Sequence, residues 1–161
     1  DRALAAADVA LGKVGAGVNI ATVDDRDKIY AQIGDGAAVT GAENVNVLAS
    51  AERDQLAVTV AAGASGTGGA AIGGGINVIV TGSDVQATVG DNTTITANGL
   101  FKVDASNTSD LTLISTSLAG STGGAAVGGT VAVIVAENQT LASVGAAAQV
   151  GAGGVLVQAV N

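Results

Sequence analysis

The segment GGAAIGGGINVIV at residues 68–80 returns 55 residues later as GGAAVGGTVAVIV at residues 123–135. A weaker copy, GAGVNIATV, begins at Gly15, and we align its Val18 with Ile76 and Val131. Repetition at a long, fixed period indicates a repeat architecture in which each unit packs on its neighbours. The repeat therefore decides the predicted fold.

The remainder of the repeat keeps its parts in the same order. The sequence AQIGD at residues 31–35 corresponds to ATVGD at 87–91 and to ASVGA at 142–146. Apolar residues at every second position follow each copy, at residues 45–49, 101–105 and 155–159. Alternation with a period of two predicts strands that bury one face.

Turn-forming residues separate the predicted strands, since Gly, Asn, Asp and Ser tolerate or stabilise tight backbone turns. We predict turns at residues 81–84, 90–92, 97–99 and 106–110. The strands predicted within one repeat cover residues 76–80, 85–89, 93–97, 100–105 and 111–116. A β-helix turn takes about 18 to 22 residues, so each repeat would make three turns and the chain about nine.

These patterns predict an all-β chain, a β-solenoid built from repeats of about 55 residues. Residues 1–161 form one segment with units at about 18–75, 76–130 and 131–161, the last one partial, and residues 1–17 end a preceding unit. The alanine-rich residues 3–13 would also suit a helix. The glycine blocks predict tight corners or a close approach of two backbones.

Composition narrows the classes of function. The chain has 25 Gly, no Pro, Cys, Met, Trp or His, and a net charge of −8. Without clustered Lys and Arg it lacks the means to neutralise phosphates, so we expect no nucleic-acid partner. Its apolar runs are shorter than the roughly 20 residues of a membrane-spanning helix. We interpret the chain as an excised or processed piece of a larger protein.

One acidic cluster could hold a metal ion. Asp24, Asp25 and Asp27 lie close together and offer the oxygen ligands that calcium prefers. Arg26 and Lys28 partly neutralise these acids, which favours a solvated loop instead. We therefore predict no metal site, although calcium at Asp24–Asp27 stays an alternative.

Enzymatic chemistry finds little support. The isolated acids Asp84, Asp91, Asp104 and Asp110 would have to supply any carboxylate pair for glycoside cleavage. The six Lys and Arg are scattered, the aromatic residues are only Tyr30 and Phe101, and nucleophilic sites based on His or Cys are excluded. We predict no catalytic residues, no cofactor-binding residues and no cofactor.

Two further features have a structural and a functional interpretation. Asn92, Asn107 and Asn138 begin Asn-X-Ser/Thr sequons, which can carry glycans but also occur by chance in turn-rich chains. Tyr30 and Phe101 could anchor a ligand. We favour for them the filling of the interior or the covering of a sheet face.

The strand sequence VGDNTTITA at residues 89–97 and the segment SNTSD at 106–110 resemble the passenger regions of giant bacterial filamentous adhesins. The resemblance covers residues 15–161. It is strongest to leukotoxin-type filamentous adhesins and weaker to filamentous haemagglutinin and autotransporter passengers. It implies a right-handed parallel β-helix at the bacterial cell surface or outside the cell, and it carries over no catalytic residue.

The leading hypothesis is a structural stalk or filament segment of a large surface or secreted adhesin. Its partners would be flanking repeats or other copies of itself, joined end to end through residues 141–161, which lack Pro and charge. One alternative is a module that binds a glycan or a host surface. A further alternative is a β-helix enzyme that degrades polysaccharides.

Overall fold

The computed structural model describes residues 2–5 and 13–161 of the chain. Strands make up 81% of the described structure, and no described residue lies in a helix. Val, Ile and Thr favour extended backbone, whereas Gly and Asn suit the sharp turns between strands. The prediction of an all-β chain is confirmed.

The described strands differ greatly in length, because long pairs alternate with short connecting strands. They are β1 (Arg2–Ala5), β2 (Val14–Ile33), β3 (Ala38–Ala42), β4 (Val45–Ser65), β5 (Ala70–Val89), β6 (Thr94–Ala97), β7 (Leu100–Ser121), β8 (Ala126–Val144), β9 (Gln149–Gly151) and β10 (Gly154–Val160).

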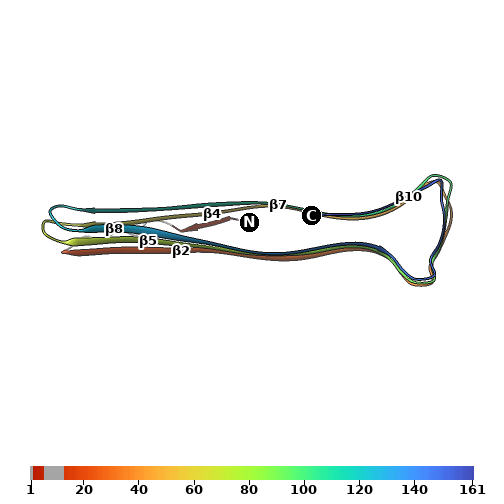
Figure 1. Ribbon diagram of the computed structural model, residues 1–161, viewed down its shortest axis with the longest axis horizontal. Coiled ribbons are helices and arrows are strands. Elements are labelled where there is room, and N and C mark those ends of the chain that lie inside the picture. Colours follow the sequence, from red (N-terminus) through yellow and green to blue (C-terminus); the bar gives the residue numbers. More distant parts are fainter. Residues whose placement is uncertain (1, 6–12) are drawn as a thin grey trace. The chain divides into compact units, whose positions relative to one another are not determined.

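The strands form three sheets in a repeating order, and β2, β5 and β8 of one sheet lie side by side in Figure 1. The strand orders are β1-β4-β7-β10, β2-β5-β8 and β3-β6-β9. From β2 onward, every set of three consecutive strands places one strand in each sheet. The pairs β1/β4, β7/β10, β3/β6 and β6/β9 are all parallel.

Paired residues lie 54 to 56 positions apart in the sequence. Ala38 pairs with Thr94, Thr94 with Gln149, and Leu100 with Gly154. One repeat therefore contributes one strand to each of the three sheets, and we call these three strands a layer. The prediction of three turns per repeat is wrong, because β2, β4, β5 and β7 are 20 to 22 residues long rather than five or six.

Two predicted turns are confirmed and two are wrong. Residues 90–92 and 97–99 do separate β5 from β6 and β6 from β7, whereas residues 81–84 lie within β5 and residues 106–110 within β7. Thr81, Ser83 and Asn107 are buried there. Their short polar side chains fit inside, so residues that usually favour turns continue the strand.

The first repeat is shifted from the predicted alignment. A Cβ atom on Gly74 would lie 3.9 Å from Val18 Cγ2 and 3.8 Å from the carbonyl oxygen of Gly129. Positions 18, 74 and 129 are therefore neighbours across β2, β5 and β8. The predicted alignment of Val18 with Ile76 and Val131 is wrong by two residues, and Ile20 takes that place.

Residues 3–5 of the stretch that could also suit a helix belong to β1, so the helical alternative is wrong there. The remainder of that stretch up to residue 12 lies outside the described residues.

The chain forms two compact units, and each unit takes a part of every repeat. Unit 1 contains Asp1–Asp25, Arg53–Thr81 and Ser109–Ala136. Unit 2 contains Arg26–Glu52, Gly82–Thr108 and Glu137–Asn161. The division falls within β2, β4, β5, β7 and β8, so these strands contribute to both units.

Unit 2 has an ordinary apolar interior. Phe101 is 0% exposed and packs in one cluster with aliphatic side chains from β4, β5 and β6. The alternation predicted for residues 45–49 and 101–105 is confirmed, since their odd-numbered residues are the buried ones. The cluster comprises Val45, Val47, Ala49, Ala51, Val85, Ala87, Val89, Ile95, Ala97, Phe101, Val103 and Ala105.

Unit 1 has an interior of small and polar side chains. Its apolar cluster is limited to Val23, Ala57 and Ile79, with Leu111 and Leu113 packed against it. Other buried residues of this unit are Ala21, Arg53, Gln55, Thr59, Ala61, Ser65, Ala71, Asn77 and Thr81.

Glycines let the backbones of unit 1 approach closely. A Cβ atom on Gly63 would lie 2.2 Å from the carbonyl oxygen of Ile72, and one on Gly73 would lie 2.6 Å from that of Leu118. Gly68 turns between β4 and β5 with a φ of +75°, a value that L side chains avoid. The predicted roles of the glycine block, corner and close approach, are both confirmed.

Candidate functional surfaces

A ladder of carboxylates joins the turns of successive repeats in unit 2. The backbone N–H of Asp91 donates to Asp35 Oδ1 at 2.9 Å, and the N–H of Ala146 donates to Asp91 Oδ1 at 2.7 Å. Each aspartate thus caps the equivalent turn of the next repeat. The third repeat has Ala146 in this place, so it presents no carboxylate for a fourth layer.

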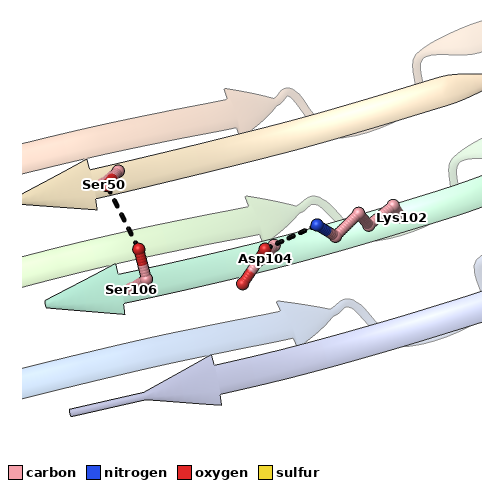
Figure 2. Close-up of polar contacts among 4 residues, drawn as sticks. All are labelled: Ser50, Lys102, Asp104 and Ser106. Carbon is pink, nitrogen blue, oxygen red and sulfur yellow. Dashed lines mark hydrogen bonds and ion pairs between the residues drawn. The ribbon is translucent and has the colours of Figure 1, made fainter.

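Other polar contacts of unit 2 connect the same layers. The hydroxyl groups of Ser50 and Ser106 are 3.1 Å apart on neighbouring strands β4 and β7 (Figure 2). Asn107 Nδ2 donates to Asn161 Oδ1 at 2.8 Å, and the N–H of Leu100 donates to Asn44 Oδ1 at 2.7 Å. These contacts stack equivalent positions and fix the register of the repeats.

Tyr30 lies on the outside of β2 and is 55% exposed. Its hydroxyl donates to Asp84 Oδ2 at 2.5 Å, and Gln86 Nε2 donates to Asp84 Oδ1 at 2.7 Å. The hydrogen bond raises the pKa of Tyr30 and lowers that of Asp84, the bond from Gln86 adding to the second effect. Tyr30 covers a sheet face and Phe101 fills the interior, which are the roles we favoured.

The other acids proposed as carboxylate candidates each have separate surroundings. Asp104 Oδ2 forms an ion pair with Lys102 Nζ at 2.7 Å along the same strand (Figure 2). Asp91 accepts a hydrogen bond from the backbone N–H of Ala146, and Asp84 accepts hydrogen bonds from Tyr30 and Gln86. Asp110 is exposed on β7. The structure brings no two of these four carboxylates into a shared contact among the interactions described above.

Asp24, Asp25 and Asp27 lie in strand β2 rather than in the loop we predicted. A strand points consecutive side chains to opposite faces, which separates Asp24 from Asp25. Asp25 Oδ2 accepts a hydrogen bond from Gln55 Nε2 at 2.8 Å. In residues 2–5 and 13–161, no group of three or more metal-binding side chains is close enough to hold an ion.

The three sequons differ in their access to solvent. Asn92 lies in an exposed turn with a φ of 54°, which asparagine tolerates. Asn107 is only 4% exposed, and its side-chain amide donates a hydrogen bond to Asn161. Asn138 is half-buried. Of the three, only Asn92 offers a side chain to a glycan.

Unit 1 contains a buried polar group that was not predicted from the sequence. Arg53 is 6% exposed, and its Nη1 donates to Thr81 Oγ1 at 3.0 Å. Gln55 is fully buried next to it. The signal was present in the alternation of β4, because Arg53 and Gln55 continue the inward positions of Ala49 and Ala51.

The last repeat presents apolar side chains at the edge of the sheets. Strands β8, β9 and β10 are terminal in their sheets, so each is paired on one side only among the described strands. Val155 and Val157 are aligned with the buried Phe101 and Val103, yet they are exposed. Other exposed apolar residues of this repeat are Val127, Val131, Val133, Ile134, Val135, Leu141, Leu156 and Val160.

Comparison of the chain with family models, with curated proteins and with solved structures finds no match in any of the three. Among the described residues there is no helix of the length and apolar character needed to cross a membrane.

Proposed function

We propose that the chain is a segment of a right-handed parallel β-helix with one repeat per turn. It would serve as a non-enzymatic stalk or filament segment of a large bacterial surface or secreted adhesin, with the layers of one copy continuing onto the next. The observation that carries this proposal is in β10 of the last described layer, where Val155 and Val157 occupy inward positions but are exposed.

The order of the strands supports a coiled path. Successive strands enter the three sheets in a fixed cycle, and equivalent strands pair in parallel. Parallel strands joined by a crossover are right-handed in about 98% of cases, which favours the same hand here.

The end of the stack supports association. A fourth layer would bury Val155 and Val157 as the third layer buries Phe101 and Val103. It would also pair the free N–H and C=O groups along β8, β9 and β10, as unprotected edges tend to do. Contacts between unlike ends do not close on themselves, so they produce filaments.

The polar groups of unit 2 support a structural rather than a catalytic role. Asp91 accepts a hydrogen bond from a turn, Asp84 accepts one from an exposed tyrosine, and Asp104 forms an ion pair with a neighbouring lysine. These three acids lie at different positions along the repeat. The resemblance to filamentous adhesins agrees with a surface location.

Sedimentation velocity and electron microscopy test the end-to-end contact. The wild-type segment should form longer particles as its concentration rises. Val155→Lys with Val157→Lys places two charges at inward positions that another layer would have to bury, so this end variant should stop the growth. The matched control is Leu156→Lys with Gln158→Lys, which adds the same charge at the alternate positions of β10 and should still grow.

A wild-type segment that stays monomeric at every concentration would contradict the proposal. Equal behaviour of the two lysine pairs would contradict the assigned contact.

A further inference from the structure

The sheet formed by β2, β5 and β8 changes the character of its outward face between the two units. In unit 2 the outward positions are mainly polar, including Lys28, Gln32, Asp84 and Gln86. In unit 1, residues 14–22, 70–80 and 125–135 present Ala, Gly, Val and Ile outward, and Thr22 is the one polar residue among these outward positions. We call this second surface the apolar face, and its exposed large side chains include Val18, Ile20, Ile72, Ile76, Val127 and Val131.

The interiors change in the opposite sense. Unit 2 buries Phe101 and aliphatic side chains, whereas unit 1 buries Gln55, Thr59, Asn77 and Thr81. Unit 1 therefore keeps polar groups inside and large apolar groups outside. Because burial of apolar area is the main favourable term in association, this unit gains most when its outside is covered.

The relief of the apolar face fits a copy of itself. Val18, Gly74 and Gly129 occupy one row across β2, β5 and β8, so this row is lowered at its two glycines on β5 and β8, and a Cβ atom on Gly129 would meet no other atom within 4 Å. The adjacent row contains Ile20, Ile76 and Val131, which project as a ridge. A surface that carries both a ridge and a lowered row can interlock with an identical surface related by a twofold axis.

The size of the apolar face is sufficient for a specific contact. Three strands about 4.8 Å apart, running for about 9 to 11 residues of about 3.3 Å each, cover roughly 500 Å². Two copies would bury about 1,000 Å² together, the lower limit of specific interfaces. Every further repeat widens the face by another strand.

A lipid surface fits less well. The edges of β8 and β2 leave backbone groups that hydrocarbon does not satisfy, since each strand is terminal in its sheet among the described strands. The net charge of −8 also opposes anionic membranes.

We propose that the apolar face pairs with the same face of a second copy of this chain, side by side. This contact uses the outside of β2, β5 and β8, whereas end-to-end association uses the strand edges and inward positions of the last repeat. The two contacts are therefore independent, and a filament that used both would be double.

The test blocks one contact and measures the other. In the end variant, Val155→Lys with Val157→Lys, light scattering should give the mass of a dimer. Adding Val18→Lys, Ile72→Lys and Val131→Lys places one charge on each strand of the apolar face, and the dissociation constant should rise at least about 100-fold. The matched control adds Gln32→Lys, Asn46→Lys and Gln158→Lys, exposed positions of unit 2, and should remain dimeric.

Three outcomes would overturn the pairing. They are an end variant that is monomeric at high concentration, a dimer that survives the lysines on the apolar face, and co-flotation of the end variant with phosphatidylcholine vesicles in place of a dimer. Circular dichroism checks that each variant keeps its strands. If end-to-end growth of the wild type is absent but the dimer forms, the proposed function fails while the lateral pairing stands.

Discussion

Tyr30 and Asp84 join equivalent strands through one exposed hydrogen bond. Because the phenol donates and the carboxylate accepts, folding favours neutral Tyr30 and charged Asp84, which accounts for the opposite pKa shifts. The stabilising effect of Asp84 is present above the ordinary pKa of aspartate and is lost as the pH falls through its lowered pKa. That of Tyr30 is present below 10.0 and is lost as the pH rises through its raised pKa.

The chain contains one tyrosine, so ultraviolet absorbance of tyrosinate reports on Tyr30 alone. We expect its pKa to lie above the ordinary value in the wild type and to fall toward it in Asp84→Ala. Gln86→Ala removes a second donor to Asp84 but leaves the tyrosine bond, so it serves as the control. An unchanged titration in Asp84→Ala would refute the assignment.

Side-chain direction at single residues was predictable where alternation was regular. The odd-numbered positions of residues 45–49 and 101–105 are inward, as the pattern indicated. Arg53 escaped notice because its charge suggested solvent, although its phase in β4 placed it inside. Its contact with Thr81 depends on a different strand, which local alternation does not specify.

At the scale of the element, the long strands of unit 1 owe their close packing to residues without side chains. Gly63 in β4 and Gly73 in β5 lie where another backbone leaves no room for a Cβ atom. Gly120 in β7 belongs to the same unit, and a Cβ atom there would meet nothing within 4 Å. Gly63 and Gly73 are therefore required for steric reasons, whereas the space around Gly120 would accept a side chain.

Gly63→Ala should destabilise the protein by about 2 kcal/mol or more, because the new methyl group would force the carbonyl of Ile72 aside. Gly120→Ala should be neutral or slightly stabilising, since it removes conformational freedom from the unfolded chain without a clash. Urea unfolding of both variants measures the difference. Equal losses would show that the backbones of unit 1 do not approach as closely as described.

The lengths and ends of the strands were the features least predictable from the sequence. Residues 81–84 and 106–110 have the composition of turns, yet they continue β5 and β7. Thr81, Ser83 and Asn107 are buried within these strands, and burial depends on packing against other strands, which no local window of sequence contains. The turns at residues 90–92 and 97–99 were predicted correctly because their composition favours turns. Backbone hydrogen bonds to neighbouring repeats stabilise the same two turns.

At the scale of the whole molecule, the two units contain the same repeats but differ in what stabilises them. Unit 2 buries an extended aliphatic cluster around Phe101, whereas unit 1 relies on glycine contacts and buried polar side chains. Buried polar groups add little net stability compared with the same volume of apolar groups. Unit 1 should therefore open more readily than unit 2.

Hydrogen exchange at concentrations below association should show this contrast within single strands. Amides of β5 in residues 82–89 should exchange more slowly than those in residues 71–81, although both belong to one strand. The same step should occur along β7. Uniform protection along β5 would contradict the unequal interiors, whatever the state of association.

The spacing of 54 to 56 residues between paired positions also sets how the chain folds. No strand of the first repeat finds its sheet neighbour nearby in sequence, so the first pairing must close a loop of about one repeat before any ladder bond compensates the lost entropy. Once two layers exist, every later repeat meets a finished template. Nucleation is then the slow event, and growth proceeds layer by layer in the direction of the chain.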